Sequence, residues 1–239
     1  WGVPGMNAWR GLYGRTAGIV GLGNNGRMLA ERLHAFGMKL IGYDKFPIQG
    51  LDYLDQKLCA RNGDTLDPLL AQSDFVILTL ALTAGPYHMI DKAALAKMKP
   101  GAFLVNMARG GIVCTEDLVA ALQSGQLGGA GLDVFEEQPL PPDHPLWRME
   151  NVYITPHSTP QVPDRAARSI EIIRENARRF EAGEPLRNLM RPSDAIAGEK
   201  GEGGWARLMQ ADASKQKIDV KLLEKFLGKR DWTDPAEWM

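Results

Sequence analysis

The sequence predicts an α/β fold built on a doubly wound parallel sheet, and three observations support this prediction. Short apolar runs of strand length alternate with segments of helical spacing along most of the chain. The run at 74–80 is almost continuously apolar, which is typical of a strand buried on both faces. A glycine-rich turn joins the first apolar run to the first helical segment. Strands that alternate with helices in this way form parallel sheets covered by helices.

The glycine-rich turn has the sequence of a dinucleotide-binding fingerprint. It reads G-x-G-x-x-G at 21–26 and stands between an apolar run and a helical segment, which is the context that this fingerprint requires. Gly21 permits a tight turn, Gly23 lets the backbone approach a pyrophosphate, and Gly26 lets the helix pack closely on the strand. The amides at the helix N-terminus would then point at the phosphates of a bound dinucleotide.

The second apolar run, at 39–43, ends in an acid. Asp44 stands where a carboxylate accepts hydrogen bonds from the adenosine ribose of NAD. The same carboxylate would repel a 2′-phosphate, although Lys45 beside it weakens that repulsion. The sequence therefore predicts a Rossmann-type domain whose cofactor is NAD rather than NADP.

The later elements are predicted from apolar spacing and from capping residues. Thr115 is expected to cap the helix that starts at Glu116, with acidic side chains at its positive end. The last helix is expected to bury an apolar face of residues spaced three and four apart, namely Ala167, Ile170, Ile173, Ala177 and Phe180. The predicted strands lie at 74–80, 102–106, 130–135 and 152–155, and the predicted helices at 65–70, 91–98, 116–123 and 164–181.

Composition divides the chain into three segments. Residues 1–15 form a lead-in rich in Gly, Pro and Trp, and residues 16–190 carry the predicted NAD-binding domain. Residues 191–239 are predicted to form a linker, charged and glycine-rich at 198–204, and a C-terminal tail with a short amphipathic helix at 219–229. Such a tail would dock on the domain, dock on a partner chain or remain disordered.

Charge and cysteine content argue against several classes of protein. The 239 residues carry a net charge of −1, with acids and bases mixed along the chain. No basic face is therefore expected for nucleic acid or for a membrane surface, and the apolar runs are too short for a membrane span. Cys59 and Cys114 are isolated, which predicts neither a metal site nor a disulfide framework and fits a reducing cytoplasm.

Polar residues follow three predicted strands at the points where those strands end. Ligands bind outside the carboxyl ends of the strands in an open α/β sheet. Taken singly, Arg109 would pair with a surface acid, Asp133 would cap a turn and His157 would be structural. Together, however, they follow strands that share one edge of the sheet, which favours function. A guanidinium grips a carboxylate, an imidazole exchanges a proton with a hydroxyl, and a nicotinamide exchanges a hydride with the same carbon.

These motifs together resemble the cofactor-binding domain of the D-isomer-specific 2-hydroxyacid dehydrogenases. The resemblance implies an NAD-dependent oxidoreductase that transfers a hydride between nicotinamide and C2 of a small D-2-hydroxy acid or 2-keto acid. It also implies a cytoplasmic enzyme that forms a homodimer through this domain. It extends from about Gly11 to Leu189 and rests on the 21–26 turn, Asp44, the 106–111 and 131–139 stretches and the Pro156-His157 pair.

The resemblance also implies roles for individual residues. Arg109 would bind the substrate carboxylate and polarise its carbonyl, while His157 would act as the acid and base. Asp133 would meet the nicotinamide amide. The implied catalytic residues are Arg109, Gln138 and His157, and the implied cofactor-binding residues are Gly21, Gly23, Asn24, Asn25, Gly26, Asp44, Ala81, Pro86, Met107, Ala108, Arg109, Asp133 and His157, with the two asparagines at the pyrophosphate.

Gln138 departs from the pattern of the family. Most of these dehydrogenases carry a Glu just before that proline, where the carboxylate raises the pKa of the catalytic His and keeps it protonated. A neutral amide orients the ring without holding its charge, so we expect ketoacid reduction to fall away at lower pH than in Glu-bearing relatives. Glu136 and Glu137 stand in the wrong register to substitute. Formate dehydrogenases carry Gln at this place, which makes formate dehydrogenase the alternative function.

A second departure concerns the substrate lobe. Members of this family carry a lobe of roughly a hundred residues before the lead-in to the first strand, within the usual range of domain sizes. The residues before the first strand here are too few to form it, and residues 191–239 are too few and too polar to replace it. We therefore expect either a piece of a longer enzyme or a catalytically silent NAD-binding module.

Overall fold

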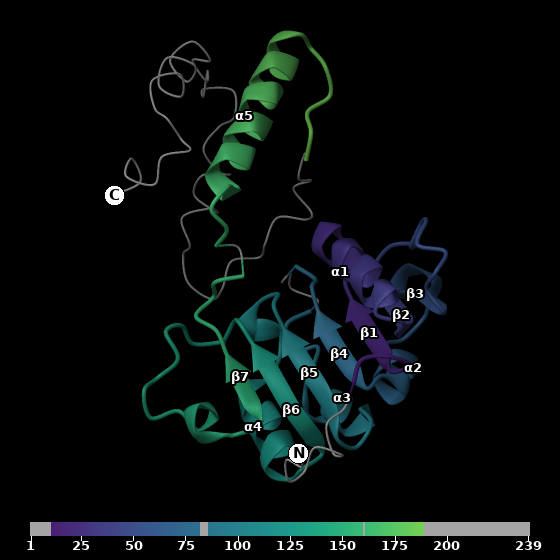
Figure 1. Cartoon of the computed structure of the whole chain (residues 1–239), viewed down its shortest axis with the longest axis vertical. Coiled ribbons are helices and arrows are strands. Elements are labelled where there is room, and N and C mark those ends of the chain that lie inside the picture. Colours follow the sequence, from purple (N-terminus) through teal and green to yellow (C-terminus); the bar gives the residue numbers. More distant parts are fainter. Residues whose placement is uncertain (1–10, 82–85, 160, 189–239) are drawn as a thin grey trace, which may run out of the picture. The chain divides into compact units, whose positions relative to one another are not determined.

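The computed structural model describes residues 11–81, 86–159 and 161–188 (Figure 1). The chain divides into two compact units, one ending at Ser158 and the other beginning at Thr159. The predicted linker and the amphipathic helix at 219–229 lie outside the described residues, as does most of the lead-in.

The first unit is built on one fully parallel sheet, which confirms the predicted fold class. Its described part contains seven strands in the order β3-β2-β1-β4-β5-β6-β7. The order reverses between β1 and β4, which makes their carboxyl ends the switch point at which such sheets bind ligands. The strands are β1 (Thr16–Val20), β2 (Lys39–Asp44), β3 (Gln56–Cys59), β4 (Phe75–Leu78), β5 (Ala102–Asn106), β6 (Leu127–Leu132) and β7 (Val152–Ile154).

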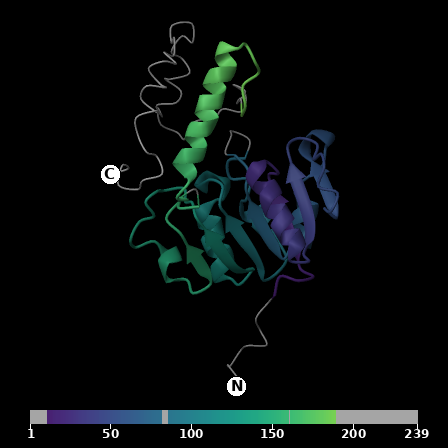
Figure 2. The same ribbon diagram turned by 45° about the horizontal axis from the view of Figure 1, so that its top comes forward.

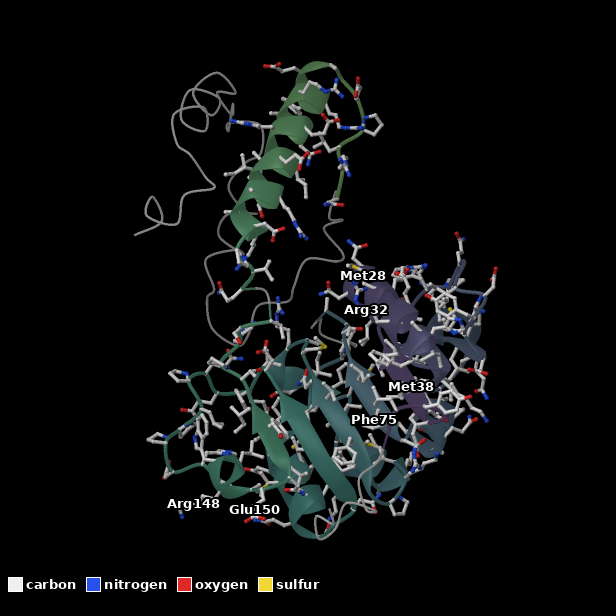
Figure 3. The ribbon with its side chains drawn as sticks, viewed as in Figure 1. Met28, Arg32, Met38, Phe75, Arg148 and Glu150 are labelled. Carbon is white, nitrogen blue, oxygen red and sulfur yellow. The ribbon has the colours of Figure 1, made fainter. Side chains whose placement is uncertain are left out.

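Helices cover both faces of this sheet. Successive strand residues point to opposite faces, and accordingly Ile19 and Val20 belong to two different apolar cores. One core packs against α2 (Asp67–Gln72), α3 (Lys92–Lys97) and α4 (Thr115–Gln123), and the other packs against α1 (Asn24–Ala35). Figure 2 shows α1 in front of the sheet. Met38 and Phe75, both labelled in Figure 3, pack in the core under α1.

The predicted N-cap of α4 was wrong. Thr115 is the first helical residue rather than the cap, and Cys114 stands at the N-cap without a side-chain hydrogen bond. The Thr115 amide instead donates to Glu136 Oε2 at 2.7 Å, from the loop after β6. A carboxylate from a distant segment thus satisfies one of the free amides at the helix N-terminus, which no local capping rule anticipates.

The described part of the second unit contains the long helix α5 (Arg165–Glu181). None of its residues is buried, and the side chain of Phe180 is 70% exposed, so the predicted buried face is not found. Charge pairs hold the end of the helix, where hydrogen bonds from Arg178 and Arg179 lower the pKa of Glu175 to about 2. Among the described residues, neither this helix nor another has the length and apolar content for a membrane crossing.

Candidate active site

The glycine turn after β1 is held by close backbone contacts. Gly21 has a φ of 93°, which favours glycine, and its amide donates to the carbonyl of Tyr43 at 2.8 Å. The carbonyl of Gly21 accepts a hydrogen bond from Thr79 Oγ1 at 2.5 Å. A Cβ on Gly26 would lie only 2.0 Å from that same carbonyl oxygen. Because Gly26 has no side chain, the first turn of α1 can pack directly against the glycine turn.

A pocket of about 240 Å³ opens beside this turn. Asp44 lies at its wall, where one carboxylate oxygen accepts the Leu22 amide at 2.7 Å and the other accepts the Phe46 amide at 3.0 Å. Arg27 spans the pocket wall, because its Nε donates to the Leu22 carbonyl and its Nη1 to the Gln49 carbonyl. The lining residues are Leu22, Gly23, Arg27, Asp44, Phe46, Pro47 and Ile48. The pocket thus presents a carboxylate and a guanidinium in an otherwise largely apolar cleft.

The loop after β5 is shaped by Asn106, whose side chain is buried. Asn106 Oδ1 accepts the Ala108 amide at 3.1 Å, and its Nδ2 donates to the Arg109 carbonyl at 3.0 Å. Arg109 itself is exposed at the carboxyl end of the strand, with Nη1 donating to the Ala108 carbonyl. A Cβ on Gly110 would lie 1.9 Å from the Phe135 carbonyl oxygen. The Arg109 loop therefore lies directly against the loop that carries Gln138.

His157 and Gln138 are hydrogen-bonded to each other. His157 Nδ1 lies 3.0 Å from Gln138 Oε1, and Gln138 Nε2 donates to the Phe135 carbonyl at 3.0 Å. Because the amide nitrogen is directed at Phe135, the oxygen faces the imidazole, and an oxygen can only accept. His157 Nδ1 therefore carries a proton, and Nε2 is the ring nitrogen that can exchange one with a ligand.

Asp133 is buried at the end of β6, with 4% of its surface exposed. Its Oδ1 accepts hydrogen bonds from Thr155 Oγ1 at 2.6 Å and from the Ser158 amide at 2.9 Å. The carboxylate thus ties the end of β6 to the segment that contains His157. Contact between Asp133 and a nicotinamide remains a prediction.

Each residue that the sequence predicts for the site lies in the segment where a parallel strand ends. Asn24 and Asn25 are exposed at the start of α1, after β1, and Ala81 and Pro86 follow β4. Met107, Ala108 and Arg109 follow β5, and Gln138 and His157 follow β6 and β7. Within the part of the chain that the structure describes, a hydrogen bond joins His157 to Gln138, and the loop that carries Arg109 packs against the Gln138 loop where Gly110 meets Phe135.

Glu136 makes contacts near the site that the sequence did not predict. Its Oε1 lies 2.5 Å from His88 Nε2, and its Oε2 accepts the Thr115 amide. Burial raises the pKa of Glu136, but the hydrogen bonds from Thr115 and His88 outweigh it, so the pKa lies below its usual value. No spacing rule could have found this contact, because Glu136 and His88 are 48 residues apart.

Replacing Glu136 by Gln is expected to destabilise the domain by about 1 kcal/mol at pH 7. Because the folded-state pKa lies below the ordinary value of 4.5, the stabilisation exists above that value and is lost as pH falls through the folded-state pKa. Urea unfolding at a series of pH values should therefore show the two proteins converging as the pH falls below 4.5 and through the lowered folded-state pKa. Glu137→Gln, an equal charge change next to it, should show a much smaller effect. A constant difference at every pH would contradict the assignment.

Several known proteins are similar to this chain in sequence. A family model described as D-isomer specific 2-hydroxyacid dehydrogenase, NAD binding domain, matches residues 1–159. A glyoxylate reductase of Korarchaeum cryptofilum is 42% identical over 179 residues, which is 75% of this chain and 53% of that protein. A glyoxylate/hydroxypyruvate reductase B of Yersinia pestis is 43% identical over 152 residues, covering 62% of this chain and 45% of that protein.

A solved structure gives the same result. The D-isomer specific 2-hydroxyacid dehydrogenase from Xanthobacter autotrophicus Py2, in complex with NADPH and MES, matches with a TM-score of 0.68 and 37% identity, covering 74% of this chain and 71% of that one. The chain spans about half the length of the curated relatives that it matches. On the extent of the family match and the shared fold, the chain belongs to the D-isomer-specific 2-hydroxyacid dehydrogenases and carries their NAD-binding domain.

Proposed function

We propose that this chain provides the cofactor-binding and proton-transfer half of a D-2-hydroxyacid dehydrogenase, which interconverts a small D-2-hydroxy acid and its 2-keto acid. The observation that carries the proposal is the hydrogen bond between His157 Nδ1 and Gln138 Oε1. It leaves Nε2 as the proton-exchanging atom. His157 and the glycine turn both lie beyond the carboxyl ends of strands in the same parallel sheet. The names of the relatives, glyoxylate and hydroxypyruvate reductases, support 2-keto acids as the substrate class.

The side chains divide the work on such a substrate. Arg109 is exposed and carries a planar guanidinium, which binds a carboxylate through two parallel hydrogen bonds. In the direction of reduction, His157 gives a proton to the carbonyl oxygen while C2 receives a hydride, so the carbonyl becomes a hydroxyl. In the direction of oxidation, neutral His157 accepts the hydroxyl proton at Nε2. Gln138 fixes the tautomer that makes this exchange possible.

The residues around the glycine turn fit a nicotinamide dinucleotide. A Cβ on Gly23 would meet nothing within 4 Å, so the backbone there is open to a pyrophosphate. The pocket beside Asp44 suits an adenosine, and the carboxylate favours the unmodified ribose of NAD over the 2′-phosphate of NADP. A bound nicotinamide supplies or accepts the hydride. We therefore propose NAD as the cofactor, whereas the relative from Xanthobacter autotrophicus is in complex with NADPH.

NADH absorbance and fluorescence in this chain test the proposal. The chain is mixed in turn with glyoxylate, hydroxypyruvate, pyruvate and 2-oxoglutarate, and formate with NAD is the reverse case. Turnover of a ketoacid supports the dehydrogenase. Turnover of formate alone would replace it by formate dehydrogenase, and NADH binding without turnover would indicate a silent NAD-binding module. The absence of NADH binding would contradict the cofactor site itself.

The extent of the domain, its self-association and its location belong to the same proposal. We propose that residues 16–190 form the NAD-binding domain and that two copies associate through it, as the family resemblance implies, in the cytoplasm. Light scattering of the same sample should give a mass near twice the 26.3 kDa of the chain. A mass of one chain would contradict the homodimer without affecting the cofactor assignment.

A Gln138→Glu variant is expected to move the pH at which ketoacid reduction falls away upward by about one unit or more. The carboxylate would accept the Nδ1 proton as the amide does now, and its negative charge would raise the pKa of the imidazole. The pH dependence of kcat/KM with NADH and the best ketoacid measures this shift. Glu137→Gln, which changes the charge of the neighbouring position by one unit in the opposite direction, serves as the charge control. An unmoved pH profile would show that residue 138 does not set the proton affinity of His157.

A further inference from the structure

The segment that carries His157 is held in a backbone conformation that side chains rarely adopt. His157 has a φ of 53°, in the left-handed region that disfavours residues with a Cβ. Such conformations persist where the surroundings hold them, and they gather at functional sites. The His157 amide donates to the Thr155 carbonyl at 3.0 Å, which closes a tight turn around Pro156. Both partners of that contact belong to the turn, so it does not attach the turn to the sheet.

Asp133 supplies the missing attachment on both sides of His157. The same oxygen, Oδ1, accepts the Thr155 hydroxyl at 2.6 Å and the Ser158 amide at 2.9 Å. These two donors flank His157 in the sequence, one before it and one after it. Hydrogen bonds to a carboxylate are shorter and stronger than those between neutral groups. The carboxylate therefore holds the left-handed turn on both sides of His157. We call these two hydrogen bonds to Asp133 the clamp.

We propose that Asp133 is a positioning residue for His157, acting through the Thr155 hydroxyl and the Ser158 amide. The inference rests on the proposed role of His157 as acid and base. It is separate from any direct contact between Asp133 and a cofactor, because it concerns the two donors that the carboxylate already holds.

Asp133 is suited to this task because its own place is fixed. Its amide donates to the Asn106 carbonyl at 3.0 Å, and its side chain is buried between β5 and the segment after β7. The Thr155 amide donates to the Leu132 carbonyl at 2.9 Å, which extends the pairing of β6 and β7 up to the clamp. Leaving a buried carboxylate without one of its donors costs free energy. Because both donors belong to the turn, movement of the turn away from Asp133 carries that cost.

Asp133 and Gln138, both in the segment after β6, thus position the imidazole of His157 through different contacts. Asp133 holds the backbone on both sides of His157, and Gln138, five positions later in the same loop, holds ring atom Nδ1. Loosening the clamp is expected to let the ring move away from Gln138. The neutral ring would then populate both tautomers, and a smaller fraction would present a free Nε2 for proton exchange.

Substitutions at Thr155 test the clamp without changing Asp133 itself, because the Thr155 hydroxyl is one of its two donors. Thr155→Val removes the hydroxyl with almost no change of shape and leaves the carboxylate in place. Thr155→Ser keeps the hydroxyl and is the matched control. The readout is the ¹⁵N chemical shift of the His157 ring nitrogens in the labelled chain at a pH where the ring is neutral. It requires no turnover, so it is independent of whether this chain is active.

In the wild type and in Thr155→Ser, the Nδ1–H tautomer is expected to dominate. In Thr155→Val, the population of the other tautomer should rise several-fold, and any ketoacid turnover should fall by about tenfold in kcat with the KM for NADH unchanged. Equal tautomer populations in Val and wild type would overturn the clamp, as would a Ser variant that behaves like Val. Thr155→Ala gives the same reading if the Val variant does not fold. A wild type without the Nδ1–H tautomer would instead contradict the proposed function of Gln138.

Discussion

A Gly23→Ala variant is expected to bind NADH about a hundredfold more weakly than the wild type while melting at the same temperature. In the protein alone, a Cβ at this position meets nothing within 4 Å, and the backbone of Gly23 lies in an extended conformation with a φ of −70°. Alanine is therefore compatible with the fold. The added methyl group would project into the space where the backbone is expected to approach a pyrophosphate, so binding alone should suffer.

Gly26→Ala is the matched variant, and it should fail in a different way. Its Cβ would lie 2.0 Å from the Gly21 carbonyl oxygen and 2.8 Å from Thr79 Oγ1, so α1 or the glycine turn must move. The expected loss is about 3 kcal/mol in the free energy of unfolding, which is roughly 10 °C in Tm, together with loss of NADH binding. Fluorescence titration with NADH and thermal melting followed by circular dichroism measure both quantities.

The two variants together test the interpretation of the turn. If Gly23→Ala binds NADH as tightly as the wild type, the open space beside this glycine is not where the pyrophosphate lies. If Gly26→Ala leaves both Tm and binding unchanged, the close approach of α1 to the turn is not required by the fold. Either result would remove the structural basis for reading the 21–26 motif as a cofactor site.

The sequence predicts the sheet best where its strands are buried on both faces. Residues Phe75–Leu78 and Ala102–Asn106 lie in the middle of the sheet, and their apolar runs are visible without a structure. Gln56–Cys59 forms the edge strand β3 and buries only Cys59, so its sequence carries no apolar pattern. The start of β6 is hidden for another reason, since Gly128 and Gly129 stand where the Gly101 carbonyl and the Phe103 ring leave no room for a Cβ.

The candidate site divides along a similar line. Which residues belong to it follows from the rule that ligands meet the carboxyl ends of parallel strands, because strand ends can be located from sequence. What each residue touches does not follow. Asp133 and Ser158 are 25 residues apart, and His88 and Glu136 are 48 apart. Such contacts depend on how loops pack. At Thr115, where a local capping rule predicted an N-cap, the carboxylate of Glu136 from a distant loop accepts the helix amide instead.

Asp44→Asn is expected to remove most of a preference for NADH over NADPH that we place at about a hundredfold in the wild type. A carboxylate and a phosphate held about 4 Å apart near a protein surface repel each other by about 4 kcal/mol per pair of unit charges, and solvent and counterions reduce that figure. About 3 kcal/mol remains as the expected discrimination. The measurement is the ratio of the two dissociation constants, obtained by fluorescence titration with NADH and with NADPH.

The charges around the pocket make this variant informative beyond the loss of repulsion. Arg27 lines the pocket, and Lys45 and Arg61 lie over the ring of Phe46, 5.6 Å and 4.4 Å from its centroid. With Asp44 neutral, the carboxylate no longer offsets the positive charge of Arg27 at the pocket wall and of the two cations on Phe46, so NADPH should gain affinity rather than merely lose a penalty. Family membership does not decide the matter, because a related structure is in complex with NADPH.

Asp52→Asn provides the control for this change. It removes one negative charge from the same stretch of chain, but its side chain is 97% exposed and paired with Lys57 rather than placed at the pocket wall. The ratio of the two dissociation constants should stay at the wild-type value in this variant. A wild type that binds both cofactors equally would overturn the assignment of NAD, whereas an equal change in both variants would trace the effect to net charge. Only a change confined to Asp44→Asn ties the choice of cofactor to the carboxylate that accepts the Leu22 and Phe46 amides.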